Sequence, residues 1–145
     1  MLELDLQNLT DVPSTRMGVV FRAEYDVINM YHDQGHYYLF TVGDDGVCEL
    51  RIRYGGGHSE FEAPPVVSEA VDRFGGVNRL HLEAIGGHFR VFVNDQFVME
   101  FEHSEYEDSN NHDFSLGDIG LFVMDPNQVG VKVGFDNLVV GLLQE

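Results

Sequence analysis

Residues 78–101 constrain the fold more than any other segment, because apolar and polar side chains alternate there in three successive runs. The runs cover Asn78–Ala84, His88–Val93 and Gln96–Phe101, and the pairs Gly86-Gly87 and Asn94-Asp95 separate them. Alternation with a period of two is typical of strands with one buried face, and two-residue turns join antiparallel neighbours. This segment therefore predicts a three-stranded β-meander.

The period of two recurs along the rest of the chain, and helical periodicity is nearly absent. Further strands are expected at residues 2–8, 17–25, 36–42, 47–54, 58–63, 119–124 and 131–142. Residues 66–74 are expected to form a short helix or an irregular crossover, and residues 103–118 a long polar loop. About ten short strands with frequent turns predict an all-β fold, a two-sheet antiparallel jelly-roll sandwich with at most one short helix.

Composition indicates one globular domain that spans residues 1–145. The chain has 145 residues, 43% of them hydrophobic, which suffices to bury roughly two-thirds of the unfolded surface. No apolar run has the length that a bilayer requires, so no membrane span is expected. The first residues carry no signal-peptide pattern.

The net charge narrows the choice of partners. Twenty-five acidic residues against eight basic ones give a formal charge of −17, and such a field repels phosphate backbones and anionic lipids. We therefore expect that the protein does not bind nucleic acid. The acidity could suit divalent cations, a basic partner, or solubility alone.

Cys48 is the only cysteine, which excludes an intrachain disulfide and a cysteine-based zinc site. It shares one predicted strand face with Leu50 and Ile52. We therefore expect a small buried side chain.

Five short motifs, in order along the chain, resemble the concanavalin A-like lectin/glucanase superfamily, and within it the laminin-G-like and 3-keto-disaccharide hydrolase-type domains. They lie at residues 18–22 (GVVFR), 36–40 (HYYLF), 78–96 (NRL through VNDQ), 119–123 (IGLFV) and 133–140 (VGFDNLVV). The resemblance implies a jelly roll and an exported or cell-surface protein, extracellular in its site of action. It specifies the activity poorly, because this architecture hosts many functions.

The sequence departs from the family pattern in two places. In the hairpin at Asn94-Asp95, aspartate stands where the family usually has glycine. An Asn-Asp pair can form a type I′ turn, although less favourably than Asn-Gly. The family also has an N-terminal edge strand before the one that residues 2–8 resemble. Its absence predicts an open sheet edge, unless the closing strand covers it, and an open edge can recruit another chain into a homo-oligomer. A sequence that is one piece of a longer protein would explain the absence equally well.

Residues 3–7 (ELDLQ) resemble the E-x-D-x-E signature of family 16 glycoside hydrolases. Alternate acids on one strand face can supply the nucleophile and the general acid of a glycosidase. Gln7 occupies the third position and cannot donate a proton. We therefore expect a polar strand face with no catalytic role, and no enzyme.

Candidate ligand-binding residues come from the aromatic and basic side chains of predicted strands. Aromatic rings can stack on sugar rings, and Tyr38 with His36 on the same face is the first choice. Arginines can bind a uronate or another anion through paired contacts. Four of them complete the expected concave-face site: Arg22, Arg51, Arg53 and Arg90. The alternatives are core packing for the rings and cross-strand ion pairs for the arginines.

Metal binding rests on the resemblance and on loop composition. The resemblance implies a structural Ca²⁺ ion near the chain ends, held by the aspartate of the F-D-N motif, here Asp136. The acidic loop at 105–118 offers further oxygen ligands, or is simply a solvated loop. A zinc site at His32 and His36 is a weaker alternative.

Three functions therefore stay open. The first is a non-catalytic recognition module that binds glycan or a protein surface. The second is a self-assembling subunit completed by a neighbouring chain, and the third is a glycoside-acting hydrolase with an unrecognised site.

Overall fold

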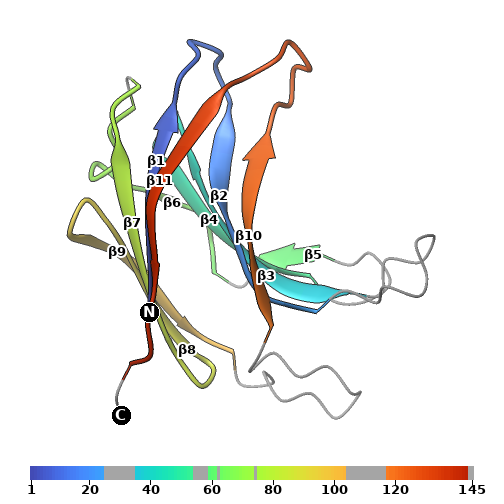
Figure 1. Cartoon of the computed structure of the whole chain (residues 1–145), viewed down its shortest axis with the longest axis vertical. Helices are drawn as coiled ribbons and strands as arrows, with labels where there is room; N and C mark the ends of the chain where they lie inside the picture. Colours follow the sequence, from blue (N-terminus) through green and yellow to red (C-terminus); the bar gives the residue numbers. More distant parts are fainter. Residues whose placement is uncertain (25–34, 54–58, 62, 74, 104–116, 144–145) are drawn as a thin grey trace.

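The structure is a computed structural model, and it describes residues 1–24, 35–53, 59–61, 63–73, 75–103 and 117–143. Within these residues the chain forms eleven β-strands and no helix (Figure 1). The strands are β1 (Leu2–Asn8), β2 (Arg16–Glu24), β3 (His36–Gly43), β4 (Val47–Arg53), β5 (Ser59–Phe61), β6 (Val66–Val67), β7 (Asn78–Ile85), β8 (His88–Val93), β9 (Gln96–Glu102), β10 (Asp118–Met124) and β11 (Val133–Val140). The described residues therefore include no helix that could cross a membrane.

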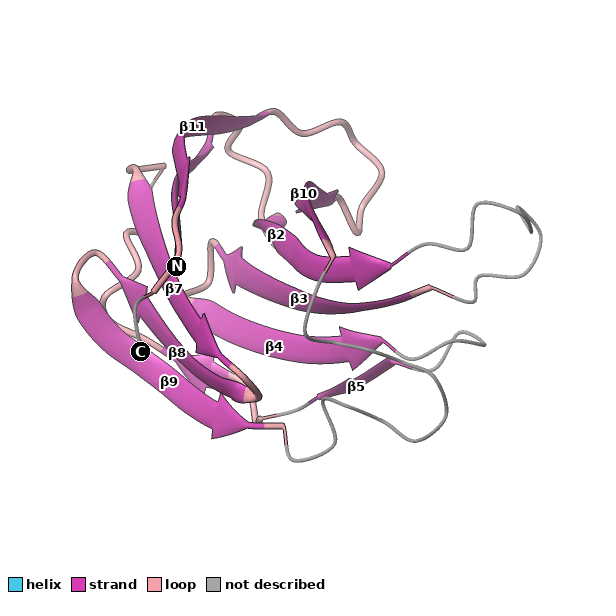
Figure 2. Cartoon of the chain, turned by 60° about the horizontal axis from the view of Figure 1, so that its bottom comes forward, coloured by secondary structure: helices cyan, strands magenta, loops and turns pink. Residues whose placement is uncertain are grey.

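Two antiparallel sheets pack face to face, as Figure 2 shows. The five-stranded sheet has the order β11-β1-β7-β8-β9. The six-stranded sheet has the order β10-β2-β3-β4-β5, and β6 pairs with β4 beside it. The predicted all-β jelly-roll sandwich is confirmed, and the segment at 66–73 is an irregular crossover with a two-residue strand.

The core forms because each strand places alternate side chains on one face. In β1, Leu2, Leu4 and Leu6 are buried while the residues between them are partly exposed. In β2 the side chains of Met17, Val19, Phe21 and Ala23 are buried.

Four aromatic rings join the two sheets in the centre of this core. Phe21 and Tyr38 stack 5.2 Å apart within the six-stranded sheet. The ring of Phe89, from the other sheet, lies 4.7 Å from Tyr38 and 4.5 Å from Phe101. The Tyr38 hydroxyl and His103 Nδ1 share a buried hydrogen bond of 2.6 Å, so the only polar group of the cluster is satisfied.

Two asparagines attach the crossover to the five-stranded sheet. The Asn78 side chain accepts from the Asp72 amide at 2.7 Å and donates to the Asp72 carbonyl at 3.0 Å. The Asn94 side chain donates to the Ala70 carbonyl and accepts from the Arg79 amide, each at 2.8 Å. The asparagines of the N-R-L and V-N-D motifs thus have a structural role.

The β8–β9 hairpin forms with the predicted Asn94-Asp95 turn. Both residues have positive φ angles, +50° and +62°, as a type I′ turn requires. Asparagine and aspartate tolerate this conformation better than other non-glycine residues.

β1 does not lie at an edge, because β11 and β7 pair with it on its two sides. The closing strand therefore covers the position at which the sequence predicted an open edge. The outer strands of the two sheets are instead β11, β9, β10 and the β5–β6 side.

Cys48 is expected to be unreactive toward thiol reagents while the protein is folded. The side chain is fully buried, and loss of hydration raises the pKa of its thiol to about 12. The thiolate is the reactive form, so we expect no labelling by a thiol reagent at pH 8 in the native protein and complete labelling in denaturant. Mass spectrometry after iodoacetamide treatment measures this. Rapid labelling without denaturant would contradict the burial of β4 in the core.

Candidate functional site

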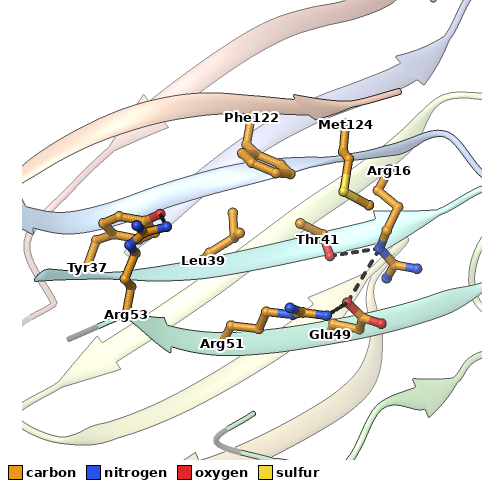
Figure 3. A pocket seen from close by; sticks show the side chains of 9 residues that line it. All are labelled: Arg16, Tyr37, Leu39, Thr41, Glu49, Arg51, Arg53, Phe122 and Met124. Carbon is orange, nitrogen blue, oxygen red and sulfur yellow. Dashed lines mark hydrogen bonds and ion pairs between the residues drawn. The ribbon is translucent and has the colours of Figure 1, made fainter. Parts of the chain in front are cut away.

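A hollow of about 250 Å³ opens on the outer face of the six-stranded sheet. Figure 3 shows the side chains around it, which come from β2, β3, β4 and β10. They are Arg16, Tyr37, Leu39, Thr41, Glu49, Arg51, Arg53, Phe122 and Met124. The volume lies just below the range of roughly 300–1,000 Å³ that is usual for ligand pockets. The hollow therefore suits a single ring or a short part of a chain.

Strand register explains why these side chains meet. Outward residues of β3 face outward residues of β4, so Tyr37 lies opposite Arg53, and Thr41 opposite Glu49. On the other side, Gly18 of β2 lies between Phe122 of β10 and Thr41.

The hollow has an apolar part and two polar ends. Leu39 lies at the centre, with Phe122 and Met124 along one side (Figure 3). At one end the Arg53 guanidinium lies 5.9 Å from the centre of the Tyr37 ring, and its Nη1 donates to the Tyr37 hydroxyl at 3.5 Å.

The opposite end is a network of ion pairs. Arg16 lies 3.6 Å and Arg51 3.5 Å from the Glu49 carboxylate. Arg16 also donates to the Thr41 hydroxyl at 3.2 Å and to the Val47 carbonyl at 2.9 Å. These bonds hold the Arg16 side chain in place.

The lining carries three arginines and one glutamate in a protein of net charge −17. The hollow is therefore a locally positive patch on an acidic molecule. Arginine forms paired, directional contacts with carboxylates, and apolar and aromatic groups pack against the apolar faces of sugar rings. The arrangement can bind an anionic ring that has one apolar face.

Two predicted ligand-binding residues are in the wrong place for that role. The sequence interpretation put Tyr38 and His36 on an exposed face, but Tyr38 is fully buried and His36 almost so. Tyr38 lies opposite Ile52, whose side chain is in the core. Since paired residues of neighbouring strands share a face, Tyr38 faces inward, and Tyr37 takes the outer face.

Arg22 is also displaced from the predicted face. A β-bulge lies between Phe21 and Glu24, and Arg22 has a φ of +48°. A bulge re-aims the side chain at its extra residue. Arg22 consequently reaches the other sheet, where it donates to the Gly86 carbonyl at 2.6 Å and lies 5.1 Å from the Phe89 ring centre.

Arg90 lies on the outer face of the five-stranded sheet, remote from the hollow. It pairs with Glu83 at 3.2 Å and lies 5.1 Å from the centre of the Phe92 ring. Of the predicted site residues, only Arg51 and Arg53 line the hollow. Whether they bind a ligand stays a prediction.

Glu3 and its neighbours form a network on that same face. The Glu3 carboxylate lies 2.9 Å from Arg79 and 3.0 Å from His81, and these bonds, led by the one from Arg79, hold the pKa of Glu3 below its usual value. Gln7 donates to the Gly75 carbonyl at 2.9 Å. The polar face of β1 thus makes structural contacts.

A second hollow of about 380 Å³ lies near the predicted calcium ligand. Asp136 accepts a hydrogen bond from the Asn137 amide, and Asn137 donates to Asp5, each at 2.7 Å. The described residues contain no group of three or more histidine, cysteine, aspartate or glutamate side chains that could hold a metal ion. His32 and residues 105–116 of the acidic loop lie outside the described residues, and calcium binding stays a prediction.

The sequence interpretation missed most of the hollow's lining. Arg16, Glu49, Phe122 and Met124 were not named as ligand-binding residues. The lining residues from β3 and β4 could have been identified by pairing these two strands, because the alternation of buried and exposed side chains in β4 is unambiguous. The place of β10 beside β2 depends on a long-range pairing that no local pattern reveals.

Similarity to known proteins appears in structure and not in sequence. No family model and no curated protein sequence matches the chain. The carbohydrate-binding module CBM66 from Bacillus subtilis matches with a TM-score of 0.62 and 17% identity, over 94% of this chain and 71% of that one. Sheep galectin-11, solved with glycerol, matches with a TM-score of 0.53 and 16% identity, over 92% and 87%. At such identities the similarity establishes the fold alone, a jelly-roll β-sandwich.

Proposed function

We propose that this protein is a non-catalytic glycan-binding module that holds an acidic sugar in the hollow of its six-stranded sheet. The observation that carries the proposal is the hollow itself, where Tyr37, Leu39 and Phe122 line an apolar part between arginine-rich ends. The fold neighbours support it, since one is named a carbohydrate-binding module and the other a galectin. The same neighbours suggest action at a cell surface or outside the cell.

The chemistry favours a uronate over a neutral sugar. Two arginines, Arg51 and Arg53, lie along one side of the hollow (Figure 3), and a carboxylate there would gain charge-assisted hydrogen bonds. Glu49 pairs with Arg16 and Arg51 and is placed to accept bonds from sugar hydroxyls. A glycosidase is not proposed, because Glu3 and Gln7 of the candidate catalytic strand are engaged in structural contacts.

The test is isothermal titration with oligouronates and with neutral oligosaccharides of equal length. We expect oligouronates to bind and to bind less tightly as salt rises, because salt screens exposed charges. Tyr37→Ala and Arg53→Ala should each weaken binding at least tenfold, about 1.4 kcal/mol.

Arg90→Ala is the matched control, because Arg90 also lies over an aromatic ring but on the opposite sheet. Its affinity should equal that of the wild type, and thermal melts should show that all variants are folded. Absence of binding to either class of sugar at millimolar concentration, or equal losses in Arg90→Ala and Arg53→Ala, would refute the proposal.

A further inference from the structure

The hollow beside Asp136 differs in chemistry from the one on the six-stranded sheet. It lies on β1 and β11 of the five-stranded sheet and has a volume of about 380 Å³. This volume falls within the range of roughly 300–1,000 Å³ that is usual for ligand pockets. The described lining includes two carboxylates and two carboxamides but no arginine, lysine or histidine. An acidic sugar would therefore be repelled here, whereas a neutral ligand would not.

Strand register brings the polar groups of this hollow together. Asp5 lies opposite Asp136, and Gln7 lies opposite Gly134. Asp5 and Gln7 alternate with buried leucines along β1, so their side chains share the outer face of the sheet with that of Asp136. Gly134 lines the hollow and contributes no side chain to it. A Cβ atom at Gly134 would make only an ordinary contact, 3.5 Å from Leu9 Cδ1.

The two carboxylates already have partners, so the hollow does not require a cation. Asp5 accepts a hydrogen bond from the Asn137 side chain at 2.7 Å and lies opposite Arg79 on β7. Asp136 accepts one from the Asn137 main-chain amide at 2.7 Å. A carboxylate has about four lone-pair sites, and therefore both groups keep acceptor sites after these bonds. Hydroxyl groups suit the remaining sites because they donate hydrogen bonds without adding charge.

Apolar side chains border the polar groups. Leu9 and Val77 both line the hollow and are 56% and 52% exposed. Gln7 donates to the Gly75 carbonyl at 2.9 Å, which holds its side chain in place. A few fixed polar groups beside apolar surface are the usual composition of a small-molecule site. A pyranose ring fits this composition, since it has hydroxyls at its rim and C–H groups on its faces.

We infer that this hollow is a second sugar-binding site, which takes a neutral pyranose. Sugar hydroxyls donate to the carboxylates of Asp5 and Asp136. A face of the ring packs against Leu9 and Val77, whose burial removes apolar surface from water. The two hollows share no lining residue, so the inference stands independently of the proposed function.

The test follows the amide signals of the ¹⁵N-labelled protein by NMR, with EDTA present so that no metal ion takes part. The probes are the methyl glycosides of glucose, galactose and mannose, and methyl glucuronoside as the acidic ring. We expect at least one neutral glycoside to shift the signals of Gln7 and Gly134. Methyl glucuronoside should bind there about tenfold more weakly or not at all.

Two variants examine the contacts. Asp136→Ala should weaken binding of the neutral glycoside about tenfold, because it removes a charged hydrogen-bond acceptor. Gly134→Leu should abolish binding, because it places a side chain in the hollow. Asp118→Ala is the matched control, since it makes the same change at an exposed aspartate of the other sheet. Its affinity should equal that of the wild type, and thermal melts should show that all variants are folded.

Three results would overturn the inference. The first is that no neutral glycoside shifts the Gln7 and Gly134 signals at tens of millimolar sugar, or that shifts occur only around Tyr37 and Arg53. The second is equal binding of methyl glucuronoside at this hollow. The third is an unchanged affinity in Asp136→Ala. Failure of oligouronates to shift Tyr37 and Arg53 would instead refute the proposed function, so the two failures are distinguishable.

Discussion

Replacement of Gly18 by alanine is expected to lower the free energy of unfolding by about 3 kcal/mol, at the upper end of the usual cost of overpacking. A Cβ atom at this position would overlap the main-chain carbonyl oxygen of Phe40 and lie 2.8 Å from the Cα of Thr41. Main-chain atoms in a central strand cannot move aside without breaking the pairing of β2 with β3. Urea unfolding followed by circular dichroism measures the change.

Gly120→Ala is the matched control, since Gly120 lies on the neighbouring strand and its added Cβ would be 3.8 Å from Val20, an ordinary contact. We expect a change below about 1 kcal/mol there, because alanine also restricts the unfolded chain. Similar unfolding free energies for the two variants would contradict the close approach of β2 and β3.

Phe89→Ala is expected to lower the free energy of unfolding by about 3–5 kcal/mol, the usual range for removing a large buried aromatic side chain. The side chain is fully buried and its ring contacts Phe21, Tyr38 and Phe101. Loss of the Phe89 ring would leave a cavity where the two sheets meet. The neighbouring aromatic rings would also lose their packing contacts with it.

Phe97→Ala provides the comparison for this variant. Phe97 is 55% exposed on β9, and the centre of its ring lies 5.8 Å from that of Phe92. Its replacement by alanine should lower the free energy of unfolding by less than about 1 kcal/mol, as is usual for surface positions. Equal costs for the two phenylalanines would mean that the aromatic cluster is not the centre of the core.

The strands were predictable because they depend on local alternation. β1, β4 and the meander each show a clear period of two, and Cys48, Leu50 and Ile52 are buried as that pattern indicates. The turn at Asn94-Asp95 was equally predictable, since both residues can adopt a positive φ.

The site was less predictable, because it depends on pairings between distant strands. In β3 both faces are rich in apolar side chains, so alternation cannot tell whether Tyr37 or Tyr38 faces the core. The register with β4 decides it, since Tyr37 pairs with Arg53 and Tyr38 with Ile52. The bulge at Arg22 has no sequence signature of its own, and it moves that arginine away from its predicted face.

Chemical-shift mapping would show whether the hollow on the six-stranded sheet binds an acidic sugar. The ¹⁵N-labelled protein would be titrated with an oligouronate while amide signals are followed by NMR. We expect the largest shifts at Tyr37, Leu39, Arg51 and Arg53, and none at Arg90 or Phe92 of the opposite sheet. Shifts confined to the five-stranded sheet, or no shifts at millimolar sugar, would contradict the proposed function.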